Sequence, residues 1–335
     1  MFAVNVWSVL RGAVTNRVEK QHQPEALAFL EQAEDFYRAA TGGVSANPLL
    51  LYYAFLNLAK VVIRARGYSG SLDRAMHGMS EQTTPGGTEL ADSQVVVKDR
   101  EATVNVFPEL IERLGYSRPA NGDTYPLVEL LPQVVVGHRI WRESQGSQKD
   151  RFVVIEDIEF VTNGSNQLWL RLFIDRGTLT RYGITFTRLL AEGGLAQSFV
   201  QARAPTGYDP GLVCFEGLQP ITYTGRPTDV VAQTVQGIRP ALWRIVTSTP
   251  ATAYRRYYIH LSPAGDVRLP QFASLWSIFY YLGSVVRYRP HLYDQILTSS
   301  YGAFVYEFVS SQPEQLLYLL ASEMAGREIA RPAIV

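Results

Sequence analysis

Two long apolar stretches, one near each end of the chain, dominate the pattern of hydrophobic and polar positions. They cover residues 48–66 and 271–288, where apolar side chains occupy nearly every face of a helix. A helix that is apolar all round is typically buried by neighbours on several sides. Asn47 and Pro48 suit an N-cap and a first helical position. The first stretch is therefore predicted to be a core helix that begins there.

Apolar residues also recur at helical spacing elsewhere in the two ends of the chain. Pro290 and Pro313 stand where a first-turn proline is tolerated, because the N–H that proline lacks has no partner there. The other helices of the two ends are predicted over residues 7–18, 23–40, 290–299, 304–311 and 313–327.

From about residue 133 the apolar residues recur with period two, which is typical of strands. Asn163 and Gly164 lie between two strand-like runs, and Asn-Gly in that position predicts a β-hairpin. After this turn, every second residue from Leu168 to Ile174 is predicted to face one way. The predicted strands are residues 95–97, 103–106, 151–161, 167–175, 182–187, 212–215 and 257–262, with short helices at 107–114, 125–131 and 188–203.

The order of helices, then strands, then helices predicts an α+β fold. Neither helical end can evidently bury its apolar faces alone, so residues 1–70 and 271–335 are predicted to form one discontinuous helical bundle. Residues 71–132 are predicted to be a loop-rich connector of mixed structure. Residues 133–270 are predicted to be a β-rich insertion between the two halves of the bundle.

Composition narrows the class of protein. The chain carries 31 basic and 31 acidic side chains, so a polycation that coats nucleic acid is excluded. Cys214 is the only cysteine, which excludes an intramolecular disulfide and a multi-cysteine metal site. No phosphate-binding glycine loop, nucleophile elbow or dinucleotide motif occurs, so we expect no cofactor. Without a secretory pattern or an apolar run of roughly 18 residues, a cytoplasmic protein that contacts no membrane is expected.

A narrow polar stripe runs along the first apolar helix at positions i, i+4, i+7 and i+11. Its members are Tyr53, Asn57, Lys60 and Arg64. This stripe suits a groove inside the bundle that binds an anion, or that pairs with an acidic residue such as Glu307 or Glu323. The alternative is that the stripe is the solvent face of the helix.

Arginines gather with aromatic residues between positions 226 and 291. This segment holds eight arginines against two aspartates, a local net charge of +6. Such a composition suits a single-stranded nucleic acid, because charge follows the backbone while rings stack on bases. The binding candidates here are Arg255, Arg256 and Arg289. The alternatives are an ordinary solvated face and, for Arg255 and Arg256, a charged guard on an edge strand.

Three separate segments of the chain resemble the YaaC-like family. They are residues 50–60, with two adjacent tyrosines followed by Asn-Leu-Ala-Lys, then His77-Gly78-Met79, and residues 283–290. Their order and the chain length also fit this family, although the β-rich middle carries no part of the resemblance. The family has no established activity, so the resemblance implies membership rather than a particular chemistry.

The tyrosine-rich helix is also similar to one in HEPN-type helical bundles, which include RNA-cleaving toxins and defence nucleases. These enzymes place an arginine and a histidine a few residues apart on a helix. The matching residues are Arg287 and His291, but only three residues separate them and Pro290 is one of the three. In this reading His291 acts as a base on a ribose hydroxyl while Arg287 holds the phosphate. The alternative is a helix junction where arginine caps carbonyl groups and His291 is a surface residue.

Three functions stay open, and the sequence does not decide whether the chain is an enzyme. The first is a non-catalytic interaction or nucleic-acid-binding module of a prokaryotic assembly, with antiviral defence as one setting. Its expected partner is a protein or a second copy of the chain, with single-stranded nucleic acid as a further candidate. The alternative is a metal-independent HEPN-type ribonuclease that uses Arg287 and His291. A sensor that binds a small molecule through the β-rich insertion is a third reading.

Overall fold

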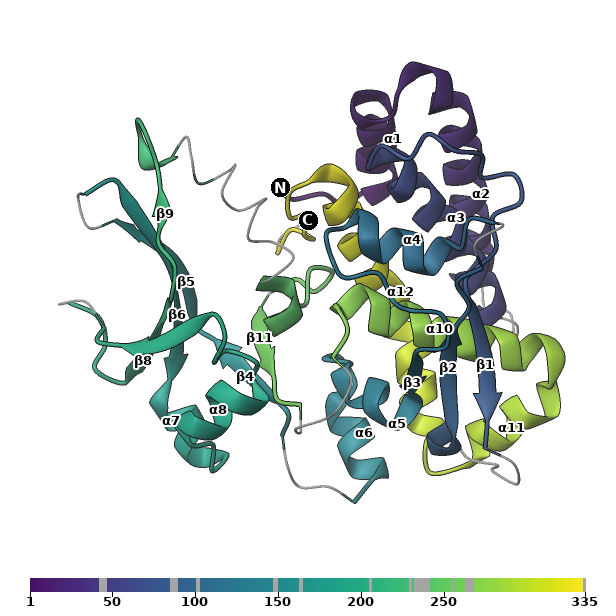
Figure 1. The fold of residues 1–335 in the computed structure, drawn as a ribbon. Helices are drawn as coiled ribbons and strands as arrows, with labels where there is room; N and C mark the ends of the chain where they lie inside the picture. The colour runs from purple at the N-terminus through teal and green to yellow at the C-terminus, as the bar shows by residue number, and fades with distance from the viewer. Residues whose placement is uncertain are drawn as a thin grey trace. The chain divides into compact units, whose positions relative to one another are not determined.

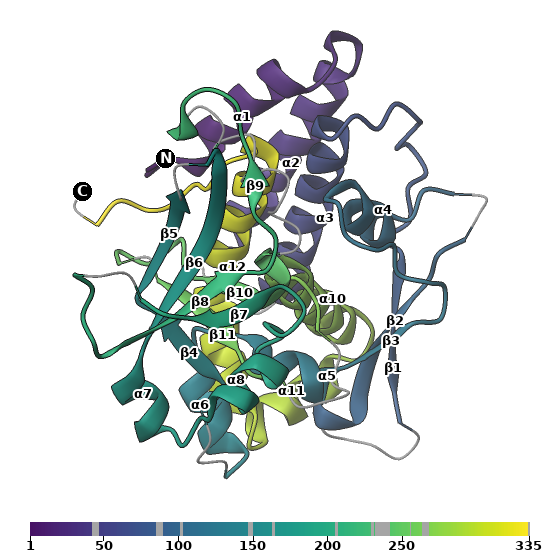
Figure 2. The same cartoon turned by 60° about the vertical axis from the view of Figure 1, so that its left-hand side comes forward.

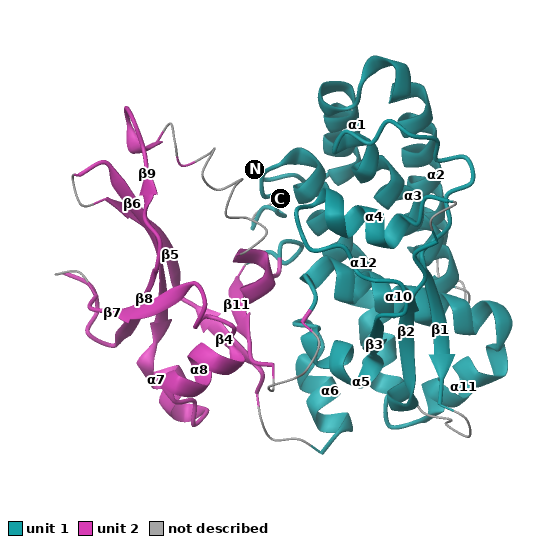
Figure 3. Ribbon diagram, in the orientation of Figure 1, with its two compact units in different colours: residues 1–147, 250–255, 269–335 teal, residues 148–249, 256–268 magenta. Residues whose placement is uncertain are grey.

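The computed structural model divides the chain into two compact units (Figure 3). The first contains residues 1–147, 250–255 and 269–335, and the second contains residues 148–249 and 256–268. Helices at both ends of the chain and strands in its middle confirm the predicted α+β fold. The residues described are 1–41, 47–84, 90–100, 103–146, 150–162, 165–204, 207–228, 231, 242–254, 256–262 and 268–333.

Helices make up most of the first unit (Figure 1). They are α1 (Val6–Arg17), α2 (Gln23–Thr41), α3 (Asn47–Ala65), α4 (Val106–Arg113), α5 (Leu127–Leu130), α6 (His138–Ser144), α10 (Gln271–Tyr288), α11 (Pro290–Thr298) and α12 (Gly302–Ala325). The two apolar stretches of the sequence are α3 and α10, and the predicted bounds of α10 are confirmed.

Aromatic side chains connect α3, α10 and α12 in the core of this unit. The ring centroid of Phe279 lies 5.3 Å from that of Phe55 and 4.6 Å from that of Phe308. Within the described part of the chain, α3 is the one helix long and apolar enough to cross a membrane. Of its apolar window, 67% is buried inside the structure, as in the core helix of a bundle.

An antiparallel sheet with strand order β1-β2-β3 lies beside α10 in the first unit (Figures 1 and 2). Its strands are β1 (Met79–Thr83), β2 (Ser93–Val97) and β3 (Thr124–Pro126). The Tyr280 hydroxyl donates to the Met79 carbonyl at 3.0 Å, and the hydroxyls of Tyr281 and Ser93 are 2.7 Å apart. Because α10 holds their sheet, residues 71–132 belong to the helical unit. The sequence had suggested a separate connector.

The second unit contains sheets of strand order β10-β11-β4 and β5-β6-β8-β7, with β9 paired to β6. The helices α7 (Arg176–Arg181) and α8 (Phe186–Glu192) belong to the same unit. Its strands are β4 (Phe152–Ile155), β5 (Asp157–Thr162), β6 (Gln167–Asp175), β7 (Phe199–Ala202), β8 (Leu212–Gly217), β9 (Ile221–Thr222), β10 (Val246–Ser248) and β11 (Tyr257–His260).

Strand β6 shows the predicted alternation. Every second residue from Leu168 to Ile174 is buried, and most of these side chains join the apolar core of the unit. Strands β5 and β6 pair antiparallel up to Thr162 opposite Leu168, as expected for two arms of a hairpin. Asn163 and Gly164, the predicted turn, lie outside the described residues.

One predicted helix start is wrong. Pro313 lies inside α12, so residues 304–311 and 313–327 are not two helices. Proline lacks the N–H that would bond to the Val309 carbonyl, but the side chains around it, Phe308, Gln312, Leu316 and Leu317, are buried, and this packing keeps the helix continuous.

Several local predictions fail where a helix start outweighs strand propensity. Residues 103–106 and 182–187 are not strands, because α4 and α8 begin at their ends. The Thr185 hydroxyl accepts the Arg188 N–H at 3.2 Å and caps α8. Residues 188–203 are divided between α8 and β7 rather than forming one helix. Asn47 lies within α3, and its Oδ1 has no hydrogen-bond partner among the described residues, so the predicted cap is absent.

Candidate functional site

The three segments that carried the family resemblance meet in the first unit. The ring of His77 lies 5.3 Å from that of Tyr280 on α10 and 6.5 Å from that of Tyr52 on α3. Gly78 has a φ of +79°, and a Cβ there would lie 2.7 Å from Cδ of Pro108, so this turn requires glycine. We call this meeting point the tyrosine–histidine cluster and define it as Tyr52, Tyr53, His77, Tyr280, Arg287 and Tyr288.

His77 is a neutral hydrogen-bond donor at neutral pH. Burial lowers the pKa of its imidazole below the ordinary value, and the positive charge of Arg287 acts in the same direction. The carboxylate of Glu81 opposes this shift. The Met79 N–H donates to Nδ1 of His77 at 3.3 Å, which assigns the ring proton to Nε2. His77 can therefore donate from Nε2, but it cannot accept a proton there as a general base in this tautomer.

The hydroxyl of Tyr52 is buried without a hydrogen-bond partner among the described residues. Only 6% of Tyr52 is exposed, and its ring lies 5.3 Å from that of Tyr280. Burial, followed by the nearby phenol of Tyr280, raises the pKa of Tyr52 far above its ordinary value. The hydroxyl is therefore always protonated, and it is a neutral polar group in an otherwise well-packed position.

Arg287 and Tyr288 form the exposed edge of the cluster. Nη1 of Arg287 donates to the Tyr53 hydroxyl at 2.6 Å, and its guanidinium carbon lies 4.9 Å from the ring centroid of Tyr288. Arg287 makes no ion pair within the described residues, and 63% of Tyr288 is exposed. A cation and an aromatic ring thus lie side by side at the surface.

Arg289, two residues further on, has a different environment. It donates to the Glu81 carboxylate at 3.2 Å and to the Thr83 hydroxyl at 3.3 Å. Glu81 also accepts a hydrogen bond from Ser284 at 2.8 Å. The charge of Arg289 is therefore already neutralised, and its role in the structure is to hold β1 against α10.

His291 lies exposed in the first turn of α11 and makes no interaction with other described residues. The structure places it with Arg287 at the junction of α10 and α11. Arg287 is oriented by Tyr53 and Tyr288, and Pro290 stands at the first position of α11 as predicted.

The predicted polar stripe of α3 mostly faces α2 rather than solvent or an open groove. Asn57 donates to Gln32 at 3.3 Å. Nζ of Lys60 lies 4.6 Å from the ring centroid of Phe29, and burial lowers the pKa of Lys60. These residues therefore join two helices of the bundle.

The last member of the stripe, Arg64, is almost fully buried and bonds to Glu25 of α2 at 2.6 Å. Pairing of the stripe with Glu307 or Glu323 is therefore wrong. Glu323 instead pairs with Arg66, at 3.3 Å. The sequence could not choose among these acids, because the choice depends on which helix packs against the stripe.

The two other arginine candidates are Arg256 and Arg255. Arg256 is exposed in the second unit, whereas Arg287 and Arg289 belong to the first. Arg255 lies outside the described residues.

Sequence reasoning missed four members of the cluster as functional residues. Tyr52, His77 and Tyr288 entered only through the family resemblance, and Tyr280 was not singled out. The available signal was the run Arg287-Tyr288-Arg289, where cations alternate with an aromatic residue after an apolar helix.

Comparison with known proteins finds one match. No curated protein and no solved structure matches the chain, and the similarity to HEPN-type bundles gains no support from these comparisons. The model of one family, the YaaC-like proteins, matches residues 6–324, which is nearly the whole chain. The chain therefore belongs to the YaaC-like protein family.

Proposed function

We propose that this protein binds single-stranded RNA through the exposed edge of the tyrosine–histidine cluster. The observation that carries the proposal is the contact between the Arg287 guanidinium and the ring of Tyr288, which is 63% exposed. Proteins that bind single strands combine cations that follow the backbone with aromatic rings that stack on bases. Here both groups are adjacent at one exposed helix junction.

Arg287 suits a phosphate contact because it is oriented without being neutralised. The Tyr53 phenol accepts one of its hydrogen bonds at 2.6 Å, and the other donors of the guanidinium fork stay available. A planar guanidinium binds phosphate oxygens in a bidentate manner. The exposed part of Tyr288 then provides the surface on which a base stacks.

Binding of a short, fluorescently labelled oligouridine tests this proposal by fluorescence anisotropy. Tyr288→Ala is expected to weaken binding by about tenfold, because stacking contributes about 1–3 kcal/mol per base. Tyr306→Ala is the matched control, since Tyr306 lies on α12 of the same unit and is 60% exposed. Equal affinity of the wild type and Tyr288→Ala, or no binding at low salt, would contradict the proposal.

A metal-independent ribonuclease is the second candidate. Its supporting observation is that Arg287 and His291 are both exposed at the junction of α10 and α11. In this mechanism the nucleophile is a ribose hydroxyl, so cleavage should persist in EDTA. His291→Ala should lower the rate by about a hundredfold or more if His291 acts as the acid or base. We expect intact RNA with wild type and variant, because Pro290 and the three-residue spacing depart from the HEPN pattern.

In this proposal the protein is a non-catalytic module of a prokaryotic assembly, and antiviral defence is one setting for it. A protein partner or a second copy of the chain completes the assembly. Light scattering of the purified chain, with and without oligouridine, tests the second-copy form. A monomer mass under both conditions would remove a second copy from the proposal and leave the RNA contact to be judged by the anisotropy experiment.

A further inference from the structure

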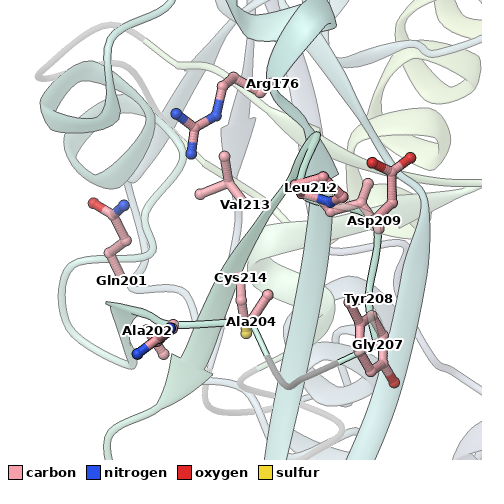
Figure 4. Close-up of a pocket in the computed structure, with 12 residues that line it drawn as sticks. Arg176, Gln201, Ala202, Ala204, Gly207, Tyr208, Asp209, Leu212, Val213 and Cys214 are labelled. Carbon is pink, nitrogen blue, oxygen red and sulfur yellow. The ribbon is translucent and has the colours of Figure 1, made fainter.

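A hollow of about 450 Å³ lies in the second unit, and none of its lining residues belongs to the tyrosine–histidine cluster. It is formed by β7, the beginning of β8 and the first residue of α7 (Figure 4). The residues that matter here are Arg176, Gln201, Arg203, Tyr208, Val213 and Cys214. Ligand pockets in proteins commonly measure about 300–1,000 Å³, so the hollow has room for a small organic molecule.

The rim of the hollow is cationic. Arg176 and Arg203 line it, and neither guanidinium has an ion pair or hydrogen bond within the described residues. Figure 4 shows the guanidinium of Arg176 and the amide of Gln201 extending on the same side of β8. Asp209 lies on the other side in this view, and its carboxylate accepts the Gly211 N–H at 2.7 Å. The acid therefore does not neutralise the arginines.

One wall of the hollow is an ordered aromatic ring. The ring of Tyr208 stacks on Phe173 with centroids 4.7 Å apart and planes 7° apart, and its hydroxyl donates to Glu159. Val213 and Cys214 are buried on β8, and Cys214 is held opposite Ala202 in the strand ladder. A ligand would meet a prearranged surface, which reduces the entropy lost on binding.

We propose that this hollow binds a small organic anion, a carboxylate or phosphate attached to an apolar or aromatic body. The guanidiniums of Arg176 and Arg203 suit a planar or tetrahedral oxyanion, while the half-buried ring of Tyr208 offers an apolar surface to the group attached to it. This site does not depend on the proposed RNA contact, because all of its residues belong to the second unit.

Ligand-observed ³¹P NMR with phenyl phosphate and the full chain tests the proposal. The phosphorus line is expected to broaden with the wild type and to stay sharp with the double variant Arg176→Ala, Arg203→Ala. Both arginines are exposed, so the double variant should fold, as circular dichroism would check. Arg181→Ala, also exposed and on α7 but not lining the hollow, is the control and should broaden the line like the wild type.

Two further measurements locate the ligand and define its class. Cys214 is the only thiol of the chain, so bound phenyl phosphate should slow its reaction with a thiol reagent in the wild type and not in the double variant. Benzoate should compete with phenyl phosphate, whereas inorganic phosphate should compete poorly because it lacks an apolar body. No line broadening with the wild type, or equal broadening with the double variant, would overturn the proposal. Equal competition by inorganic phosphate would overturn the role of the Tyr208 ring as an apolar surface.

Discussion

Nη1 of Arg287 and the hydroxyl of Tyr53 are joined by a 2.6 Å hydrogen bond across 234 positions of sequence. The bond connects the last turn of α10 to the first half of α3. The residue proposed to contact phosphate therefore also ties together the two apolar helices that the sequence marked as the core. The proposed phosphate contact and the packing of α3 against α10 both depend on Arg287, so tests of packing should use other residues.

Gly283 is the first such test, because it marks the close approach of α10 to α3. A Cβ added there would lie 3.0 Å from Cβ of Tyr52 and 3.1 Å from the Pro48 carbonyl oxygen. Gly283→Ala is expected to lower the free energy of unfolding by about 1–2 kcal/mol, since overpacking outweighs the better helix propensity of alanine. Urea unfolding followed by circular dichroism measures this change.

Gly12 provides the matched control for Gly283. It lies within α1, and an added Cβ would meet no atom within 4 Å. Gly12→Ala should raise the free energy of unfolding by about 0.5–1 kcal/mol, because alanine is the better helix former. The same gain for Gly283→Ala would show that α3 and α10 do not approach closely at that position.

Removing the Tyr52 hydroxyl should not destabilise the protein. This buried group has no hydrogen-bond partner among the described residues, so Tyr52→Phe removes a desolvated polar atom and loses no protein hydrogen bond. We expect the free energy of unfolding to stay the same or to rise by about 1 kcal/mol. A fall of similar size would mean that the hydroxyl has a partner in solution, and thermal unfolding of both proteins decides the matter.

His77 should make stability depend on pH. Its pKa is lowered in the folded protein, mainly by burial. As the pH falls below about 6.5, the ordinary histidine pKa, the unfolded chain binds the proton first. Stability from this residue is therefore present above that pH and is lost towards the lowered folded pKa.

The pH effect is measured as the difference between urea midpoints at neutral and mildly acidic pH. Carboxylates contribute equally to the wild type and to His77→Gln, so the difference between the two proteins isolates the imidazole. The wild type should lose more stability on acidification than the variant. An identical loss in both proteins would rule out a lowered pKa for His77.

The interface of α2 and α3 supplies a fourth prediction. Arg64 is nearly fully buried and bonds to Glu25 at 2.6 Å and to the Tyr68 carbonyl at 2.8 Å. Arg64→Met should cost about 2–3 kcal/mol, because both acceptors lose a charged donor. Lys60→Met, on the same stripe, should cost less than about 1 kcal/mol, since the charge of Lys60 interacts with the ring of Phe29 and, without a direct ion pair, with Glu25. An equal loss of unfolding free energy in the two variants would contradict the stronger bonding of Arg64 compared with Lys60.

Local sequence patterns predicted the helices and strands that depend mainly on the residues within them. The bounds of α10 and β6 follow from an unbroken apolar run and from strict alternation, and Pro290 begins α11 as expected. Pro313 was misread because the packing of a long buried helix outweighs the cost of one internal proline. The strand at 182–187 failed because the capping hydroxyl of Thr185 outweighed the propensity of its neighbours.

Relationships over long sequence distances were not predictable from such patterns. The Tyr280 hydroxyl reaches the Met79 carbonyl 201 positions away, and this contact brings the supposed connector into the helical unit. The sequence marked Tyr53 and Arg287 as candidates but could not show that they are in contact. It also could not show that Tyr288, at the end of a buried helix, is exposed, since only the packing around α10 decides that.

The salt dependence of RNA binding tests the proposed phosphate contact most directly. Each phosphate contact releases counterions, so removing one such contact should reduce the slope of log Kd against log salt by about one. We expect Arg287→Gln to bind oligouridine more weakly and with this smaller slope. Tyr288→Ala should also weaken binding but keep the slope of the wild type. An unchanged slope for Arg287→Gln would contradict the assignment of Arg287 as the residue that contacts phosphate.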